Sequence, residues 1–183
     1  MNSPHFERAF GAAWFELPRE IRDLHEVSDV RRFAGIARVE RGRQFIPRLI
    51  ASLFGFPPAA DACPVQVTKT REANGELWER QFDLKRFRSR CAPAPEAGRF
   101  RERFGAFLFE VDLDVSNGVV SMPLRRGWFL GIPLPRWTLP ESETREFVAN
   151  NRFHFDVALR APLSGALIVR YQGYLVPDDQ VLG

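Results

Sequence analysis

The sequence is poor in cysteine, histidine and lysine, and it has no long apolar run. Its 183 residues include two cysteines and three histidines, and no apolar stretch approaches the roughly 20 residues that a membrane-spanning helix needs. Residues 1–8 lack the charged start and the short apolar core of a secretory signal. These absences predict a cytoplasmic protein without a transmembrane segment.

The two cysteines are not expected to form a disulfide. Cys63 and Cys91 flank a predicted hairpin without facing each other, and bridged cysteines need Cα atoms within about 7 Å. We therefore expect two reduced thiols.

Common catalytic and nucleotide-binding motifs are also missing. The chain has no glycine-rich phosphate loop, no Cys-x-x-Cys, no His-Glu-x-x-His and no Gly-x-Ser-x-Gly. Its three histidines are scattered, so a metal site would have to be assembled from distant segments. We predict no metal, no cofactor and no catalytic residue. Whether the protein is an enzyme stays undecided, with a non-enzymatic role favoured.

Phenylalanine and arginine are abundant instead. The 17 phenylalanines lie mostly in alternating runs, which is typical of strand cores. Because Lys69 and Lys85 are the only lysines, the other 24 of the 26 basic residues are arginine, yet the formal net charge is only +3. Arginine binds anions in a bidentate manner better than lysine. A GC-rich genome also favours arginine codons, so only arginine clusters carry information about function.

Local patterns divide the chain into an N-terminal helical segment, residues 1–30, and a β-rich body, residues 31–177. The clearest helix covers residues 45–54, where an apolar stripe ends at Gly55 and a Pro-Pro pair. The stripe consists of Phe45, Ile46, Leu49, Ile50 and Leu53. We expect it to pack against the sheet.

Two Asn-Gly pairs, at residues 74–75 and 117–118, predict type I′ hairpins. The first would pair Lys69 with Arg80, and the second would pair Phe109 with Arg126. With two further strands after residue 151, the prediction is an α+β, mainly antiparallel fold. About seven strands would form a curved meander sheet or half-open barrel, with the helix of residues 45–54 packed on or in it. No linker divides the chain, so residues 1–183 are predicted to form a single domain.

Arginines between large apolar residues are the most suggestive feature. In Trp78-x-Arg80-x-Phe82 the period of two places all three side chains on one face, which is the predicted interior. Arg126 repeats this arrangement beside Trp128 on the second hairpin. Burying an unpaired guanidinium costs several kcal/mol, so each of these arginines either reaches the rim of the sheet or has a partner in the interior.

Two kinds of partner remain open. One interpretation is internal pairing with an acid such as Glu102 or Asp156. The other is a binding module that holds an apolar or amphipathic anionic, lipid-like small molecule in its concave face. The candidate ligand-binding residues are Trp78, Arg80, Phe82, Arg126, Trp128, His25 and Glu102. Alternatively, the same cavity serves an enzyme of unknown reaction, with His25 and a carboxylate such as Glu102 or Asp156 as acid and base.

Two surface features suggest a third class of function. Basic residues 85–90 and 99–103 would share one face if their strands are adjacent, as in a nucleic-acid or anionic membrane-surface binder. The low net charge favours a solvated face and no nucleic-acid partner. The apolar segment 127–137 fits a lid, a membrane-dipping loop or a buried connection, so peripheral membrane contact stays open.

A series of short motifs keeps a distinctive order from about Leu17 to Pro177. The motifs are Leu17-Pro18, Leu24-His25, Gly35-x-Ala37, Gly55-x-Pro57, Trp78-x-Arg80-x-Phe82, Phe87-x-Ser89, Glu102-Arg103-Phe104-Gly105, Gly131-x-Pro133-Leu134-Pro135, Phe153-x-Phe155-Asp156-Val157, Pro162-Leu163 and Tyr171-x-Gly173-x-Leu175. In these the chain resembles the bacterial family called Domain of Unknown Function 4166. The resemblance implies no established activity and assigns no role to any residue. It does imply a functional link to a saccharopine-dehydrogenase-like protein, because family members look like stand-alone proteins or C-terminal partners of such domains.

Overall fold

Alternating apolar and polar residues build most of the chain into strands. The computed structural model describes residues 4–178. Within this range the strands are β1 (Val30–Arg41), β2 (Ala60–Glu72), β3 (Gly75–Phe82), β4 (Lys85–Pro93), β5 (Arg99–Phe104), β6 (Phe107–Asp112), β7 (Asp114–Ser116), β8 (Val119–Ser121), β9 (Leu124–Phe129), β10 (Ile132–Pro133), β11 (Glu141–Ala149), β12 (Arg152–Arg160) and β13 (Leu167–Pro177). The helices are α1 (His5–Phe10), α2 (Arg19–His25) and α3 (Phe45–Leu53), with short 3-10 turns η1 (Gly11–Glu16) and η2 (Arg136–Thr138).

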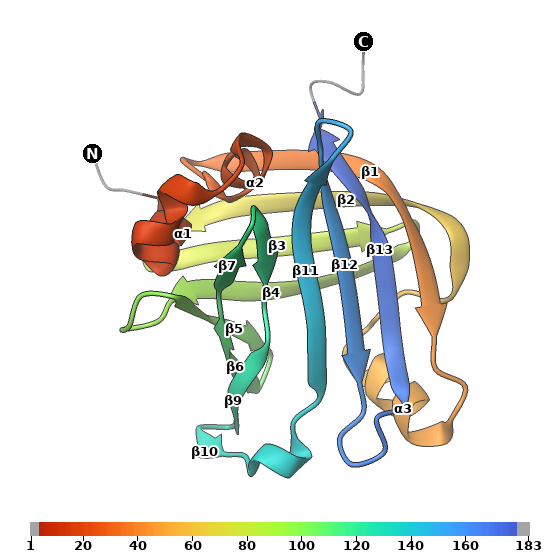
Figure 1. The fold of residues 1–183 in the computed structure, drawn as a ribbon. Helices are drawn as coiled ribbons and strands as arrows, with labels where there is room; N and C mark the ends of the chain where they lie inside the picture. The colour runs from red at the N-terminus through yellow and green to blue at the C-terminus, as the bar shows by residue number, and fades with distance from the viewer. Residues whose placement is uncertain (1–3, 179–183) are drawn as a thin grey trace.

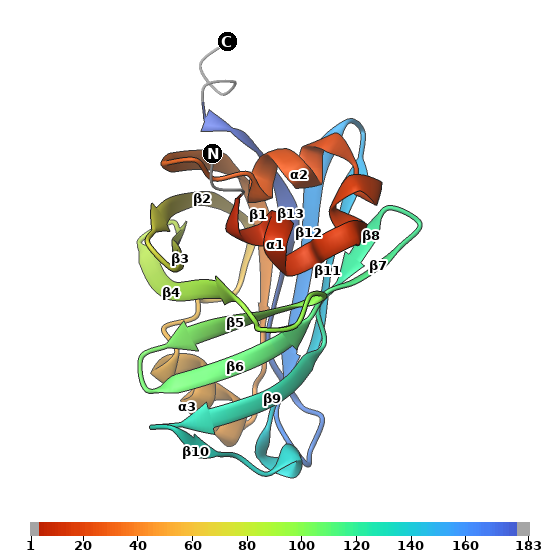
Figure 2. The same ribbon diagram turned by 90° about the vertical axis from the view of Figure 1, so that its left-hand side faces the viewer.

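All of these strands belong to one open antiparallel sheet, in the order β10-β9-β6-β5-β4-β3-β2-β1-β13-β12-β11-β8-β7. The sheet curls so that its two wings face each other, with α1 and α2 across one end and α3 at the other (Figures 1 and 2). The predicted antiparallel β class is confirmed. The prediction of about seven strands was wrong, since the part of the chain that the structure describes contains thirteen. The difference arises because residues 107–133 form several short strands and because β11, rich in polar residues, was not recognised.

The first hairpin forms with a register two residues away from the predicted one. Lys69 pairs with Trp78, and Glu72 pairs with Gly75. Gly75 does not have the positive φ of a type I′ turn. A Cβ at this position would lie 2.2 Å from the carbonyl oxygen of Cys91, so glycine is needed here for close strand approach. A shift of two residues keeps every side chain on its predicted face.

The second hairpin has the predicted turn but not the predicted faces throughout. Asn117 and Gly118 both have positive φ, as a type I′ turn requires. Further along, a β-bulge shifts the register between Val111 and Glu110, so Phe109 lies opposite Gly127 and not opposite Arg126. The extra residue reverses the faces of the following part of β9.

Helix α3 forms where the sequence predicts it, but its apolar stripe does not pack against the sheet. The side that faces the protein carries the small residues Pro47 and Ala51, which are buried. Most of the predicted stripe is exposed, with Phe45 79% and Leu53 69% accessible. The expectation of a covered stripe was therefore wrong.

Candidate functional site

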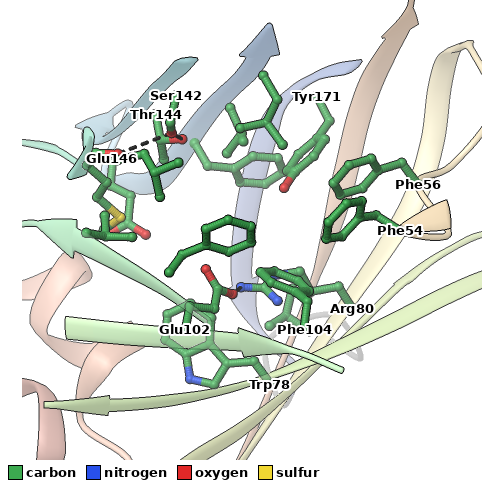
Figure 3. A pocket seen from close by; sticks show the side chains of 18 of the residues that line it. Phe54, Phe56, Trp78, Arg80, Glu102, Phe104, Ser142, Thr144, Glu146 and Tyr171 are labelled. Carbon is green, nitrogen blue, oxygen red and sulfur yellow. Dashed lines mark hydrogen bonds and ion pairs between the residues drawn. The ribbon is translucent and has the colours of Figure 1, made fainter. Parts of the chain in front are cut away.

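The concave face of the sheet surrounds a cavity of about 190 Å³. Its wall is mainly apolar, with side chains from both wings that include Phe82, Phe100, Phe155 and Leu175. The polar residues that line it are Lys69, Arg80, Glu102, Ser142, Thr144, Glu146 and Tyr171. Figure 3 shows Arg80, Glu102, Ser142, Thr144, Glu146 and Tyr171 projecting from different strands around one space. The concave side of the curved sheet is therefore hollow.

The guanidinium of Arg80 lies in this cavity and is held by neighbouring strands. Arg80 Nη2 donates to Glu102 Oε1 over 3.1 Å, and Nη1 donates to the Ser89 hydroxyl over 2.8 Å. Ser89 in turn donates to Glu102 Oε1 over 2.6 Å. These contacts follow from the sheet order, because β3, β4 and β5 lie side by side. Arg80 thus has an internal acid partner.

Aromatic rings complete the surroundings of Arg80. Its guanidinium carbon lies 4.9 Å from the centre of the Trp78 ring and 5.6 Å from that of Phe87, distances typical of cation–π contacts. Burial alone would lower the pKa of Arg80, but attraction to Glu102 raises it above the ordinary value. Arg80 is therefore a permanently charged group whose charge is already balanced.

A second polar cluster joins β2, α2 and β11. Lys69 Nζ donates to the Leu24 carbonyl over 2.9 Å and lies 3.3 Å from His25 Nδ1. His25 Nε2 lies 2.7 Å from Glu146 Oε2. While Lys69 is protonated it can only donate, so His25 Nδ1 accepts and Nε2–H donates to the Glu146 carboxylate. This fixes the histidine tautomer.

The protonation of this cluster follows from burial and mutual charge. Burial and the charge of Lys69 lower the pKa of His25, so the imidazole is neutral at pH 7. Burial alone would raise the pKa of Glu146, but the contact with His25 and the charge of Lys69 lower it. Burial lowers the pKa of Lys69 to about 8. Lys69 also lies 3.7 Å from the centre of the Trp78 ring, which connects the two clusters.

Hydroxyl groups supply the rest of the cavity's polarity. Ser142 and Thr144 share a hydrogen bond of 2.9 Å on β11. The Tyr171 hydroxyl points from β13 into the same space as Arg80 and Glu102 (Figure 3). Burial raises the pKa of Tyr171 to about 12, so this hydroxyl stays protonated and can both donate and accept.

The structure brings most of the predicted site residues to the cavity. Trp78, Arg80, Phe82 and Glu102 all line it. His25 is completely buried and lies one residue behind the wall, in contact with Glu146. These positions provide the inward-facing cluster that the alternation of residues 78–82 predicts.

Arg126 and Trp128 lie elsewhere. The bulge in β9 places both on the outer face, where Arg126 is exposed and Trp128 is half-buried beneath Arg101, whose guanidinium carbon lies 5.7 Å from the ring centre. Their predicted inward orientation was wrong. Asp156, proposed as an internal acid, instead pairs with Arg145 and Arg170 at 3.2 and 2.8 Å.

Sequence reasoning missed Lys69, Glu146 and Tyr171 as cavity residues. Lys69 had a usable signal, because it continues the inward alternation of Val65 and Val67. Glu146 had none, because β11 was not recognised as a strand and its partner His25 is 121 positions away. The carboxylate near His25 is therefore Glu146, and neither Glu102 nor Asp156.

The arginine-rich strands do share the outer face, as predicted. Arg90 pairs in register with Arg103, while Arg101 contacts Glu110 at 3.1 Å and Arg99 contacts Asp112 at 2.8 Å. Interleaved acids partly neutralise this face, as the interpretation of a solvated surface requires. Segment 127–137 is mostly exposed at the sheet edge, so it is not a buried connection.

Fold and cavity together define a protein with a curved antiparallel sheet around a small, mainly apolar cavity that contains two buried charge clusters. Within residues 4–178, no group of three or more His, Cys, Asp and Glu side chains is placed to hold a metal ion, and both cysteines are free. No helix in this range has the length and apolar character to cross a membrane.

The model of the family described as Domain of unknown function (DUF4166) matches residues 17–175, and the chain belongs to this family. No curated protein matches the chain. No solved structure matches it either.

Proposed function

We propose that the protein is a binding module whose cavity holds one small, mainly apolar molecule with a neutral polar group. The observation that carries this proposal is the mainly apolar wall around a small set of buried polar groups, a combination typical of small-molecule sites. The volume of about 190 Å³ exceeds the ~150 Å³ of an engineered cavity that binds benzene. It is smaller than the roughly 300–1,000 Å³ of drug-sized sites. A monocyclic ring or a short branched chain fits this space.

The charge balance favours a neutral ligand over the anionic one that the sequence suggested. Glu102 already pairs with Arg80, and an incoming carboxylate would lie beside that acid in a poorly solvated space. Like charges at short range disfavour this arrangement. A hydroxyl or carbonyl group can instead hydrogen-bond to free N–H groups of Arg80 or to the Tyr171 hydroxyl without disrupting the pair.

Matched neutral and anionic probes test the proposal. Titration calorimetry should show binding of benzyl alcohol and weaker or no binding of benzoate at pH 7. Val157→Phe, which adds a ring to the cavity wall, should weaken benzyl alcohol binding, and Val30→Phe on the surface should not. Failure of benzyl alcohol and similar small neutral rings to bind, or equal binding by the Val157→Phe variant, would refute the proposal.

A second candidate function, catalysis in the same cavity, is favoured by the His25–Glu146 contact. Glu146 lines the cavity and is oriented from behind by a histidine, as a carboxylate general base would be. Its lowered pKa makes it a weak base, since a base works best with a pKa near the working pH. This places catalysis second.

An ester probe distinguishes the two candidates. If Glu146 is a base, wild-type protein should hydrolyse p-nitrophenyl acetate faster than Glu146→Gln, while both bind benzyl alcohol equally. Equal rates in the two proteins would remove catalysis through Glu146 and leave the binding proposal standing.

A further inference from the structure

Helix α3 presents an apolar face to the solvent. The exposed fractions are 79% for Phe45, 61% for Ile46, 59% for Leu49 and 69% for Leu53. Isolated exposed apolar residues are common on protein surfaces, but a contiguous set on one helix face marks an interaction site. We therefore expect this helix face to bind another molecule or a lipid surface.

Other residues of α3 and its C-terminal end face the protein and the cavity. Ile50 and Phe54 line the cavity wall, and Pro47 and Ala51 are buried against the protein. The thickness of one helix therefore separates the cavity from the exposed apolar face.

Further apolar side chains are exposed at the same end of the molecule. Figures 1 and 2 show α3, β10, η2 and the β12–β13 loop at one end, opposite α1 and α2. At this end Leu130 is 71%, Ile132 67%, Trp137 63% and Leu163 85% exposed. The apolar surface of α3 is thus part of a larger apolar end, contributed by three separate segments.

A basic groove of about 370 Å³ lies beside α3. Arg41, Arg48 and Lys85 line it, together with Gly42 and Ser52, and its described lining includes no acidic side chain. Arg48 and Lys85 are exposed, whereas Arg41 Nη1 donates to the carbonyls of residues 56 and 57 at 2.8 Å. An anionic group placed here would meet three cations next to an apolar helix.

We propose that α3 docks this end of the protein onto an anionic membrane surface. Phe45, Leu49 and Leu53 enter the boundary between headgroups and acyl chains, as the apolar faces of interfacial helices do. Arg41, Arg48 and Lys85 then lie at the level of the lipid phosphates. The proposal goes beyond the cavity function and does not depend on it.

A second copy of the chain is a poorer occupant for this surface. In a two-fold dimer the same patch meets itself, so the cations of the two grooves would lie close together. A lipid surface supplies the opposite charge and an apolar layer at once. The exposed apolar residues of α3, with Arg41, Arg48 and Lys85 beside them, are therefore complementary to an anionic lipid surface.

Vesicle sedimentation tests the proposal with the full chain. Wild-type protein should bind vesicles of phosphatidylcholine mixed with phosphatidylglycerol, more weakly at high salt, and bind phosphatidylcholine alone far less. Leu49→Glu should reduce binding at least tenfold. Arg48→Ala should reduce it about fivefold, the effect of about one basic residue near an anionic surface.

Phe15→Glu is the matched control, because Phe15 is 73% exposed and lies on η1 at the opposite end. It should bind vesicles like wild-type protein, and all variants should keep the wild-type melting temperature. In wild-type protein, vesicles should also slow amide exchange in residues 45–54. The proposal is overturned by absent vesicle binding, by equal losses in Phe15→Glu and Leu49→Glu, or by a wild-type dimer that Leu49→Glu dissociates.

Discussion

Removing the carboxylate of Glu102 should destabilise the protein more than removing both partners of the Arg80–Glu102 pair. In the single variant Glu102→Leu, the Arg80 guanidinium keeps the Ser89 hydroxyl but loses its counter-charge. In the double variant Arg80→Met/Glu102→Leu, both charges of this pair are removed together. The comparison tests whether the cavity is dry enough for Arg80 to depend on an internal acid.

The expected magnitude follows from the burial of the pair. The side chains of Arg80 and Glu102 are 14% and 16% exposed, and both line the cavity. Leaving one partner of a buried pair alone costs about 3–5 kcal/mol, and we expect about 3 because the cavity has room for some water. At about 2–4 °C per kcal/mol for a chain of this size, the melting temperature should fall by about 6–12 °C.

Urea and thermal unfolding of both variants provide the measurement. The double variant should lie within about 1 kcal/mol of wild type, since apolar replacement of a buried pair is often neutral. Glu143→Leu is the control, because its pair with Arg160 is on the surface, with the side chains 60% and 37% exposed. Its loss should be under about 1 kcal/mol. An equally small loss in Glu102→Leu would refute the reasoning and show that water solvates Arg80.

Three further predictions concern buried groups and close strand contacts. The pKa of His25 in the folded protein is below 6.5, so the unfolded chain binds the extra proton at low pH. Stability measured with urea should therefore fall as pH drops below 6.5, and it should fall less in His25→Gln. An identical pH profile in this variant would contradict a neutral, buried His25. The pKa of Lys69 is about 8 in the folded protein against 10.5 in the unfolded chain, so between these pH values the unfolded chain binds the extra proton. As pH rises from 8 to 10.5, the free energy of unfolding of wild type should therefore increase by about 3 kcal/mol relative to Lys69→Met. A constant difference would show that Lys69 is not desolvated. Gly173→Ala should cost about 1–3 kcal/mol in urea unfolding, because its Cβ would lie 2.1 Å from the Ile36 carbonyl oxygen; unchanged stability would contradict the close contact.

The sequence predicts the face of a residue correctly even where the predicted strand pairing is wrong by two residues. It does not predict the face correctly beyond a β-bulge. Alternation places Trp78, Arg80 and Phe82 together whatever strand lies opposite, so the two-residue shift in the first hairpin left the cluster intact. In β9 a single extra residue turned Arg126 and Trp128 to the outer face. Their local alternation carries no signal of that bulge, because it resembles that of residues 78–82.

Helical periodicity predicts which residues share a face, but not what covers that face. Phe45, Leu49 and Leu53 do lie together on α3, as predicted, and yet they are exposed. The small side chains Pro47 and Ala51 let the other face approach the protein closely. A prediction that the more apolar face of α3 is buried is wrong here, because the more apolar face is the exposed one.

The His25–Glu146 contact could not have been found locally. It joins α2 to β11 across 121 positions. Polar residues fill the start of β11, Glu141 to Arg145, because that strand lies near the sheet edge with one face in solvent. The alternation that reveals an internal strand is weak there, and pairing order in a sheet of this size is a tertiary property.

The two charge clusters have a common consequence for ligand choice. Lys69 donates to a backbone carbonyl and lies near His25, and its charge interacts favourably with the nearby Glu76 and Glu146. Arg80 donates to Ser89 and Glu102. Both cavity cations therefore already have acids nearby. Glu146 and Glu102 face the same space and repel negative charge. A charged ligand would have to break the Arg80–Glu102 pair, which costs several kcal/mol. A neutral polar group can form hydrogen bonds while this pair stays intact. The proposed preference of the interior for neutral ligands follows from these contacts, whereas the cations beside α3, Arg41, Arg48 and Lys85, line an outer groove that the proposed anionic surface would reach.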